Sequence, residues 1–129
     1  MSAVIHDARQ AVDHAPENAG LRGRLGNLLA AAGEIEEAER ELRHAIELDG
    51  AKAGFHSALS GVLDRQGRRE EALAAARQAV DLAPENPRFQ CRFGVLLERG
   101  EQLGQAEQAF RAAVDCGGSV SRIMSRGAV

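Results

Sequence analysis

The chain repeats itself at a fixed spacing, and this feature constrains its fold more than any other. Residues 76–86 read ARQAVDLAPEN and match residues 8–18, ARQAVDHAPEN, at every position except Leu82 against His14. The two segments are 68 residues apart, which is twice a 34-residue unit. Internal similarity at such a period is typical of stacked structural units, each of which buries its apolar face against its neighbours. The sequence therefore predicts a repeat array rather than a globule around one core.

The unit at residues 53–86 is predicted to fold as two helices joined by a turn. Apolar residues recur every three or four positions in both halves, which is the spacing of one helix face. Gly67 separates the halves and can take the left-handed conformation that follows a helix. The predicted inward positions are Phe55, Leu59, Val62 and Leu63, then Ala72, Leu73, Ala76, Ala79, Val80 and Leu82.

The same register continues on both sides of this unit. Residues 19–52 predict helices at about 21–32 and 35–48 around Gly33, and residues 87–120 predict a third pair that starts at Pro87. In this third pair the turn glycine, Gly100, comes one place early and Gly104 stands where a helix should begin, so we expect a looser turn there. The inward positions outside the central unit are predicted to include Val4, Ile5, Ala8, Ala11, Val12, Leu21, Leu25, Leu28, Leu29, Ala38, Leu42, Ala45, Ile46, Leu48, Phe89, Phe93, Leu96, Leu97, Ala106, Ala109, Phe110, Ala113 and Val114.

The two ends of the chain are incomplete in this register. Residues 1–18 correspond to a second helix without its first helix, and residues 121–129 form a tail too short for a full helix. We therefore expect a single domain over residues 1–129 with about three and a half repeats.

The second helix of the first unit, residues 35–48, is rich in glutamate. The pairs Glu36 with Arg40 and Glu39 with Arg43 are spaced to attract, whereas Glu37 and Glu41 are spaced to repel.

Charge and composition exclude several classes of function. The net charge is −3 and no run of basic residues stands out, which argues against a general nucleic-acid or anionic-membrane surface. No apolar run approaches the length that spans a bilayer, and the start of the chain lacks a signal-peptide pattern. The two cysteines, Cys91 and Cys116, form no disulfide framework, so we expect a cytoplasmic protein. Lys52 is the only lysine, which hints at a bacterial gene.

Three sets of residues, 34 positions apart, resemble the tetratricopeptide repeat. The first set has Leu25-Gly26 and Leu29, then Ala38, Leu42, Ala45 and Gly50; the second has Leu59-Ser60 and Leu63, then Ala72, Ala76, Ala79 and Pro84; the third has Phe93-Gly94 and Leu97, then Ala106, Phe110, Ala113 and Gly118. The resemblance implies an all-α, right-handed α-solenoid of antiparallel helix pairs. Small residues in these sets are expected to let paired helices approach closely.

The chain departs from the family pattern at its aromatic positions. The tryptophan position holds Arg22, His56 and Gln90, the tyrosine position holds leucine in every unit, and two of the three proline positions hold glycine. The aromatic contacts of the family are therefore missing.

The resemblance also implies that the first helices line a concave groove that binds a peptide or a partner helix. These helices, residues 19–32, 53–66 and 87–100, carry six arginines against Asp64 and Glu98, a charge of +4 that leaves −7 to the rest of the chain. This segregation favours an acidic ligand. The predicted groove residues are Arg24, Asn27, Ser57, Gly61, Arg88, Arg92 and Arg99, with Gly20, Gly23 and Gly54 leaving room for a ligand backbone.

Some family members hold a peptide carboxylate with a clamp of basic and asparagine side chains, and the chain matches this clamp only in part. Asn27 and Arg92 match, Arg88 stands for a lysine, and Gly23 and Ala58 replace the remaining two groups. Arg88 and Arg92 are one helical turn apart and could fork onto one carboxylate.

No residue set in the sequence supports catalysis or a cofactor. His6, His14, His44 and His56 lack metal-ligand spacing, and the acidic pairs fall on solvated helix faces. We therefore expect an interaction scaffold that is not an enzyme and that binds no cofactor, nucleic acid or membrane.

An alternative is a segment that self-associates through the half-repeat helix, as part of a longer, bacterial multidomain enzyme. RNA binding by a helical-repeat scaffold is a third reading, which the acidic chain disfavours.

Overall fold

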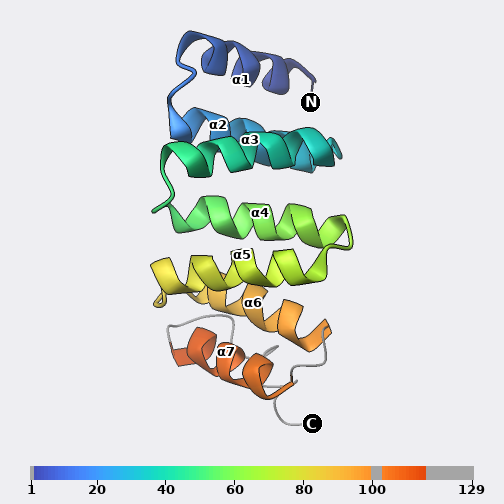
Figure 1. The fold of residues 1–129 in the computed structure, drawn as a ribbon, viewed down its shortest axis with the longest axis vertical. Helices are drawn as coiled ribbons and strands as arrows, with labels where there is room; N and C mark the ends of the chain where they lie inside the picture. Colours follow the sequence, from blue (N-terminus) through green and yellow to red (C-terminus); the bar gives the residue numbers. More distant parts are fainter. Residues whose placement is uncertain (1, 100–102, 116–129) are drawn as a thin grey trace.

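A computed structural model describes residues 2–99 and 103–115, and within these residues the chain folds into seven helices and no strand (Figure 1). The helices are α1 (Ser2–His14), α2 (Ala19–Ala31), α3 (Ile35–Leu48), α4 (Ala53–Arg65), α5 (Arg69–Leu82), α6 (Pro87–Arg99) and α7 (Leu103–Asp115). This confirms the prediction of an all-α repeat solenoid. The predicted loose turn at Gly100, Cys116 and the tail at residues 121–129 lie outside the described residues.

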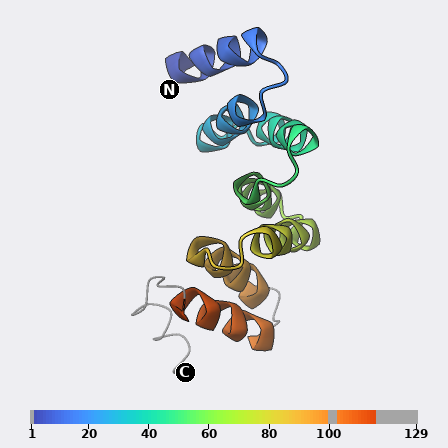
Figure 2. The same ribbon diagram turned by 90° about the vertical axis from the view of Figure 1, so that its left-hand side faces the viewer.

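The helices form a stack in which each contacts mainly its neighbours in sequence. The pairs α2 with α3, α4 with α5 and α6 with α7 pack together, and α1 packs on α2. In Figure 2, α2, α4 and α6 follow one another on the left, whereas α3 and α5 lie on the right. The side of the first helices and the side of the second helices are thus two different surfaces of the stack.

Glycine ends the first helix in each of the first two complete units. Gly33 has φ of 88° and Gly67 has φ of 76°, values that favour glycine because other residues strain there. The Glu34 amide donates to the Leu29 carbonyl, and the Arg68 amide donates to the Leu63 carbonyl in the same way. The predicted turns are confirmed at both places.

Small residues let the paired helices approach closely. A Cβ placed on Gly26 would lie 2.7 Å from Cγ of Leu42, and one on Gly94 would lie 2.8 Å from the Phe110 ring. Ser60, at the equivalent position of the middle unit, is fully buried, and its hydroxyl donates to the Ser57 carbonyl at 2.7 Å. The contact therefore depends on residues no larger than serine.

A polar contact repeats at the family's tryptophan position. Arg22 Nε donates to the Pro16 carbonyl at 2.8 Å, and Gln90 Nε2 donates to the Pro84 carbonyl at 3.2 Å. His56 Nε2 lies 2.9 Å from the carbonyl oxygen of Gly50. Each side chain thus reaches a carbonyl six residues earlier and ties the loop between two units to the next first helix.

Three apolar residues that were predicted to face inward are exposed. The exposed fractions are 45% for Val4, 37% for Leu48 and 38% for Leu82. Leu48 and Leu82 are the last residues of α3 and α5, where the chain turns away from the stack. The predictions for these three residues were wrong.

We predict opposite effects for two glycine substitutions in the first helices. Gly26→Ala should lower the free energy of unfolding by about 1–2 kcal/mol, because overpacking exceeds the gain in helix propensity. Gly54→Ala should raise it by up to about 1 kcal/mol, because a Cβ there meets nothing within 4 Å. Urea denaturation of both variants measures the difference, and changes in the same direction would contradict the close-approach role of Gly26.

Candidate functional site

The first helices present an exposed face that carries most of the predicted groove residues. Arg24 and Asn27 on α2 are exposed, as are Arg88 and Arg92 on α6. Within the described residues, Arg24, Arg88 and Arg92 donate no side-chain hydrogen bond and form no ion pair, so their guanidinium groups keep their donors for a ligand. We call these four residues, together with Gly61 on α4, the α2–α4–α6 face: Arg24, Asn27, Gly61, Arg88 and Arg92.

Arg92 reaches from α6 to α4 on this face. A Cβ placed on Gly61 would lie 2.9 Å from Nη1 of Arg92, so the guanidinium rests against the glycine. The absence of a side chain at position 61 therefore makes room for Arg92, where the sequence suggested room for a ligand. Arg88 lies one helical turn before Arg92 on the same helix.

Two arginines of the first helices, Arg22 and Arg65, bond to other parts of the chain and are not available to a ligand on this face. Arg22 Nη1 donates to Glu41 at 2.9 Å while its Nε holds the Pro16 carbonyl. Arg65 Nη1 donates to the Ala30 carbonyl at 2.7 Å and so links α4 to the end of α2. The positive charge available to a ligand is therefore smaller than the sequence indicates.

Two small residues do not open the face as predicted. Ser57 is only 9% exposed, so little of it is open to a ligand, and its part in the groove stays a prediction. Gly23 is covered by Phe55, whose ring would lie 2.3 Å from an added Cβ. Gly54 and Gly20 remain exposed.

The residues of the partial clamp are not all brought together. Asn27 lies on α2 and Arg88 and Arg92 lie on α6, with α4 between these helices (Figure 2). Ala58, which stands in the clamp on α4, is half-buried. Only Arg88 and Arg92 share one helix face, and the side chain of Arg99 lies outside the described side chains.

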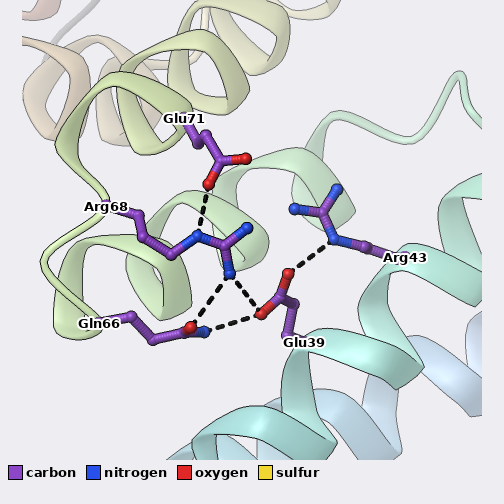
Figure 3. Close-up of polar contacts among 5 residues, drawn as sticks. All are labelled: Glu39, Arg43, Gln66, Arg68 and Glu71. Atoms are coloured by element: carbon purple, nitrogen blue, oxygen red, sulfur yellow. Dashed lines mark hydrogen bonds and ion pairs between the residues drawn. The ribbon is translucent and has the colours of Figure 1, made fainter.

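A charged cluster joins the second unit to the first, and sequence reasoning found only part of it (Figure 3). Glu39 accepts from Arg43 at 2.8 Å, as its spacing predicted, and also from Gln66 and Arg68 at 2.9 Å each. Arg68 in turn donates through Nε to Glu71. The guanidinium of Arg68 therefore lies between two carboxylates from different helices.

The cluster lowers the pKa of both of its carboxyl groups. Burial is the largest influence on Glu39 and would raise its pKa, but the hydrogen bonds from Gln66 and Arg43 and the charge of Arg68 together outweigh it. The hydrogen bond from Arg68 lowers the pKa of Glu71. Both carboxylates are thus stabilised in their charged form.

Arginines recur every 34 residues along the second helices. They are Arg9, Arg43, Arg77 and Arg111, on α1, α3, α5 and α7. Arg9 holds Glu37 with both terminal nitrogens, of which Nη2 lies 2.9 Å from Oε1, and Arg77 donates to Gln105 at 3.3 Å. Arg77 also lies 5.0 Å from the centre of the Phe93 ring. These contacts tie α1 and α5 to the next unit, whereas Arg43 and Arg111 pair with Glu39 and Glu107 on their own helices.

An open cleft of about 830 Å³ lies where α1 meets α2 and α3. We call it the α1–α3 cleft, and its lining residues are Ala3, Ile5, His6, Arg9, Leu29, Ala32, Glu34 and Glu37. It lies at the ends of the first helices rather than on the α2–α4–α6 face. No feature of the sequence analysis pointed to it.

Other candidate chemistry finds little geometric support. Cys91 is half-buried and packs against the apolar core. In the described part of the chain, no three His, Cys, Asp or Glu side chains come together as a metal ion would require. None of the helices in the described ranges has the length and apolar character of a bilayer-spanning segment.

We predict a pH dependence of stability that involves Glu39. Because its pKa is lower in the folded chain than its ordinary value of 4.5, the stabilisation is present above that value and is lost as the pH falls through the folded pKa. Glu39→Gln should therefore flatten the fall in free energy of unfolding between about pH 7 and pH 3. Chemical denaturation across this range measures it.

The control for this prediction is Glu47→Gln, since Glu47 is exposed and makes no side-chain hydrogen bond within the described residues. This variant should follow the wild-type curve. Parallel curves for wild type and Glu39→Gln would show that the cluster adds nothing to stability.

The chain resembles solved structures of helical-repeat proteins. A crystal structure of MamA is 17% identical with a TM-score of 0.81, covering 88% of this chain and 66% of that one. YrrB is described as a tetratricopeptide-repeat protein with an unusual peptide-binding site. It is 24% identical with a TM-score of 0.79, and the match covers 85% of this chain and 57% of YrrB. The chain thus spans somewhat less than two thirds of the length of these proteins, and the likeness shows the fold alone.

Comparison with sequence families agrees with the fold. No curated protein matches the chain. Two models described as tetratricopeptide repeat match residues 3–60 and 60–120, and together they cover nearly the whole described structure. Together with the repeat register, the glycine turns and the close helix pairs, these matches show that the chain belongs to the tetratricopeptide repeat family.

Proposed function

We propose that this protein is an interaction scaffold whose α2–α4–α6 face binds an acidic peptide segment of a partner protein. The observation that carries the proposal is the set of three exposed arginines, Arg24, Arg88 and Arg92, that have no hydrogen-bond or ion-pair partner among the described residues. Guanidinium groups hold carboxylates with paired hydrogen bonds, and a rigid helix presents them at fixed positions. The peptide-binding site named for YrrB supports this class of ligand for a similar fold.

The geometry suggests how a ligand would be held. Arg92 rests against Gly61, so its guanidinium loses less conformational freedom on binding than a free arginine would. Arg88 adds a second guanidinium one turn away and can engage the same or the next carboxylate. At Gly54 nothing lies within 4 Å of an added Cβ, which leaves space for a peptide backbone near α4.

Self-association remains a second proposal, and the exposed side chain of Val4 on α1 favours it. An apolar side chain that the described residues leave exposed can contact a second copy. A mass that rises with concentration in light scattering would support this proposal, and a monomer at all concentrations would remove it.

The test of the proposed function uses a short blocked peptide of alternating Glu and Ala with a fluorescent label. The Arg88→Ala, Arg92→Ala double variant should bind it about tenfold or more weakly than wild type, because charged hydrogen bonds are lost. Fluorescence anisotropy at low and high salt measures the binding. The wild-type affinity should also fall as salt rises, since the contacts are exposed to solvent.

The matched control removes two exposed arginines from the second helices, Arg40→Ala and Arg69→Ala. It has the same net charge as the test variant and should bind as wild type does. Equal weakening by both double variants would indicate nonspecific charge attraction. Equal binding of a Gln-Ala peptide, or no effect of salt, would refute recognition of acidic side chains.

A further inference from the structure

The α1–α3 cleft has an apolar floor and a charged edge. Ile5 and Ala32 supply its accessible apolar surface, and Leu29, which also lines it, is fully buried. Glu34 and Glu37 supply carboxylates, and Arg9 binds Glu37 at the edge. Ala32 and Glu34 are exposed, so the cleft is open to a protein side chain rather than enclosed around a small molecule.

The repeat places a counterpart of this cleft one unit later, and there the equivalent side chains bond to one another (Figure 3). Adding 34 to each of five lining residues gives the five residues of Figure 3. The pairs are Ile5 with Glu39, Arg9 with Arg43, Ala32 with Gln66, Glu34 with Arg68, and Glu37 with Glu71. The same positions of the repeat therefore line an open cleft at the first junction and form a hydrogen-bonded polar network at the second.

Three of these five pairs account for the difference. At the second junction, Arg68 donates to Glu39 at 2.9 Å and to Gln66 at 3.1 Å, and it also holds Glu71. At the first junction the equivalent of Arg68 is a glutamate, and the equivalents of Glu39 and Gln66 are Ile5 and Ala32. The first junction thus keeps the carboxylate of Glu37, which Arg9 holds, and has no guanidinium at position 34, where a glutamate stands.

We propose that the α1–α3 cleft binds an arginine side chain from a basic, apolar segment of a partner protein. The methylene stem of that arginine would lie on Ile5 and Ala32, and its guanidinium would reach Glu34 and Glu37. Glu34 makes no side-chain hydrogen bond within the described residues. Each oxygen of Glu37 accepts one bond from Arg9 and retains a further lone pair.

Charge complementarity selects this ligand over an acidic or a neutral one. Two carboxylates and one guanidinium line the cleft, which leaves a net negative charge for a cation. A planar guanidinium can bridge two carboxylates, as Arg68 does at the second junction. The site is separate from the α2–α4–α6 face and would take a ligand of opposite charge.

The test titrates the full chain, labelled with ¹⁵N, with the blocked tripeptide acetyl-Leu-Arg-Leu-amide. The same peptide with citrulline, which keeps the shape of arginine without its charge, is the matched ligand. The amide signals of Ile5, Ala32, Glu34 and Glu37 should shift and saturate with an affinity of about 1 mM. The citrulline peptide should bind about tenfold more weakly.

The triple variant I5E/A32Q/E34R carries into the first junction the residues that fill the second. It should keep the fold, judged by its NMR spectrum, and lose the response to the arginine peptide. The Arg92→Ala variant should keep that response, so a failure of the proposed function and a failure of this site give different results. Equal shifts with the citrulline peptide, no saturable shift at the cleft, or a response that survives in the folded triple variant would overturn the proposal.

Discussion

The close contact between the two helices of each unit is the constraint on which the rest of the structure depends. Leu42 fits over Gly26 and Phe110 fits over Gly94, at distances that leave no room for a larger residue. Leu29, Leu42, Leu63 and Leu97 are buried as a consequence. Because each unit buries its apolar residues against its neighbours, the stack does not depend on a single central core.

This local packing leaves many positions of the repeat unconstrained, and the chain uses them differently in each unit. The family's tryptophan position holds a cation, an imidazole and an amide, yet Arg22, His56 and Gln90 all reach the preceding loop carbonyl. Two of the five junction positions hold apolar residues at the first junction, whereas all five hold polar or charged residues at the second. Equivalent positions of the repeat can therefore hold residues of different chemical types, and the surface differs from one unit to the next.

The two faces of the stack differ in how their charges are used. On the side of the second helices, Arg9 on α1 and Arg68, directly before α5, are held by carboxylates and link successive units. On the first helices, Arg88 and Arg92 are exposed and hold no carboxylate within the described residues. Surface ion pairs contribute little each, so the paired arginines serve mainly to fix the register between units. The unpaired ones are available for recognition.

The sequence predicted what depends on neighbours along one helix or one turn. The turns at Gly33 and Gly67, the start of α6 at Pro87 and the pair of Glu39 with Arg43 all follow from local spacing. It did not predict contacts between units, such as Arg68 with Glu39 or Phe55 over Gly23. These depend on how far one helix pair is rotated against the next, which no local pattern encodes.

The same reason explains the errors at the candidate site. Ser57 was predicted to line the groove, yet it is only 9% exposed. Gly61 was predicted to leave room for a ligand, but the long side chain of Arg92, from the next unit, lies against this glycine. The α1–α3 cleft could have been suspected by aligning Ile5, Ala32 and Glu34 with Glu39, Gln66 and Arg68, although only coordinates show that these residues meet.

The central claim is that residues at equivalent positions of the repeat are interchangeable between units and decide locally whether a junction is open or filled. A crystal structure of the I5E/A32Q/E34R variant tests this most directly. The account predicts that the arginine introduced at position 34 lies between Glu37 and the glutamate introduced at position 5, with the cleft closed and the helices unmoved. An open cleft with these side chains in solvent, or a displaced α1, would contradict it.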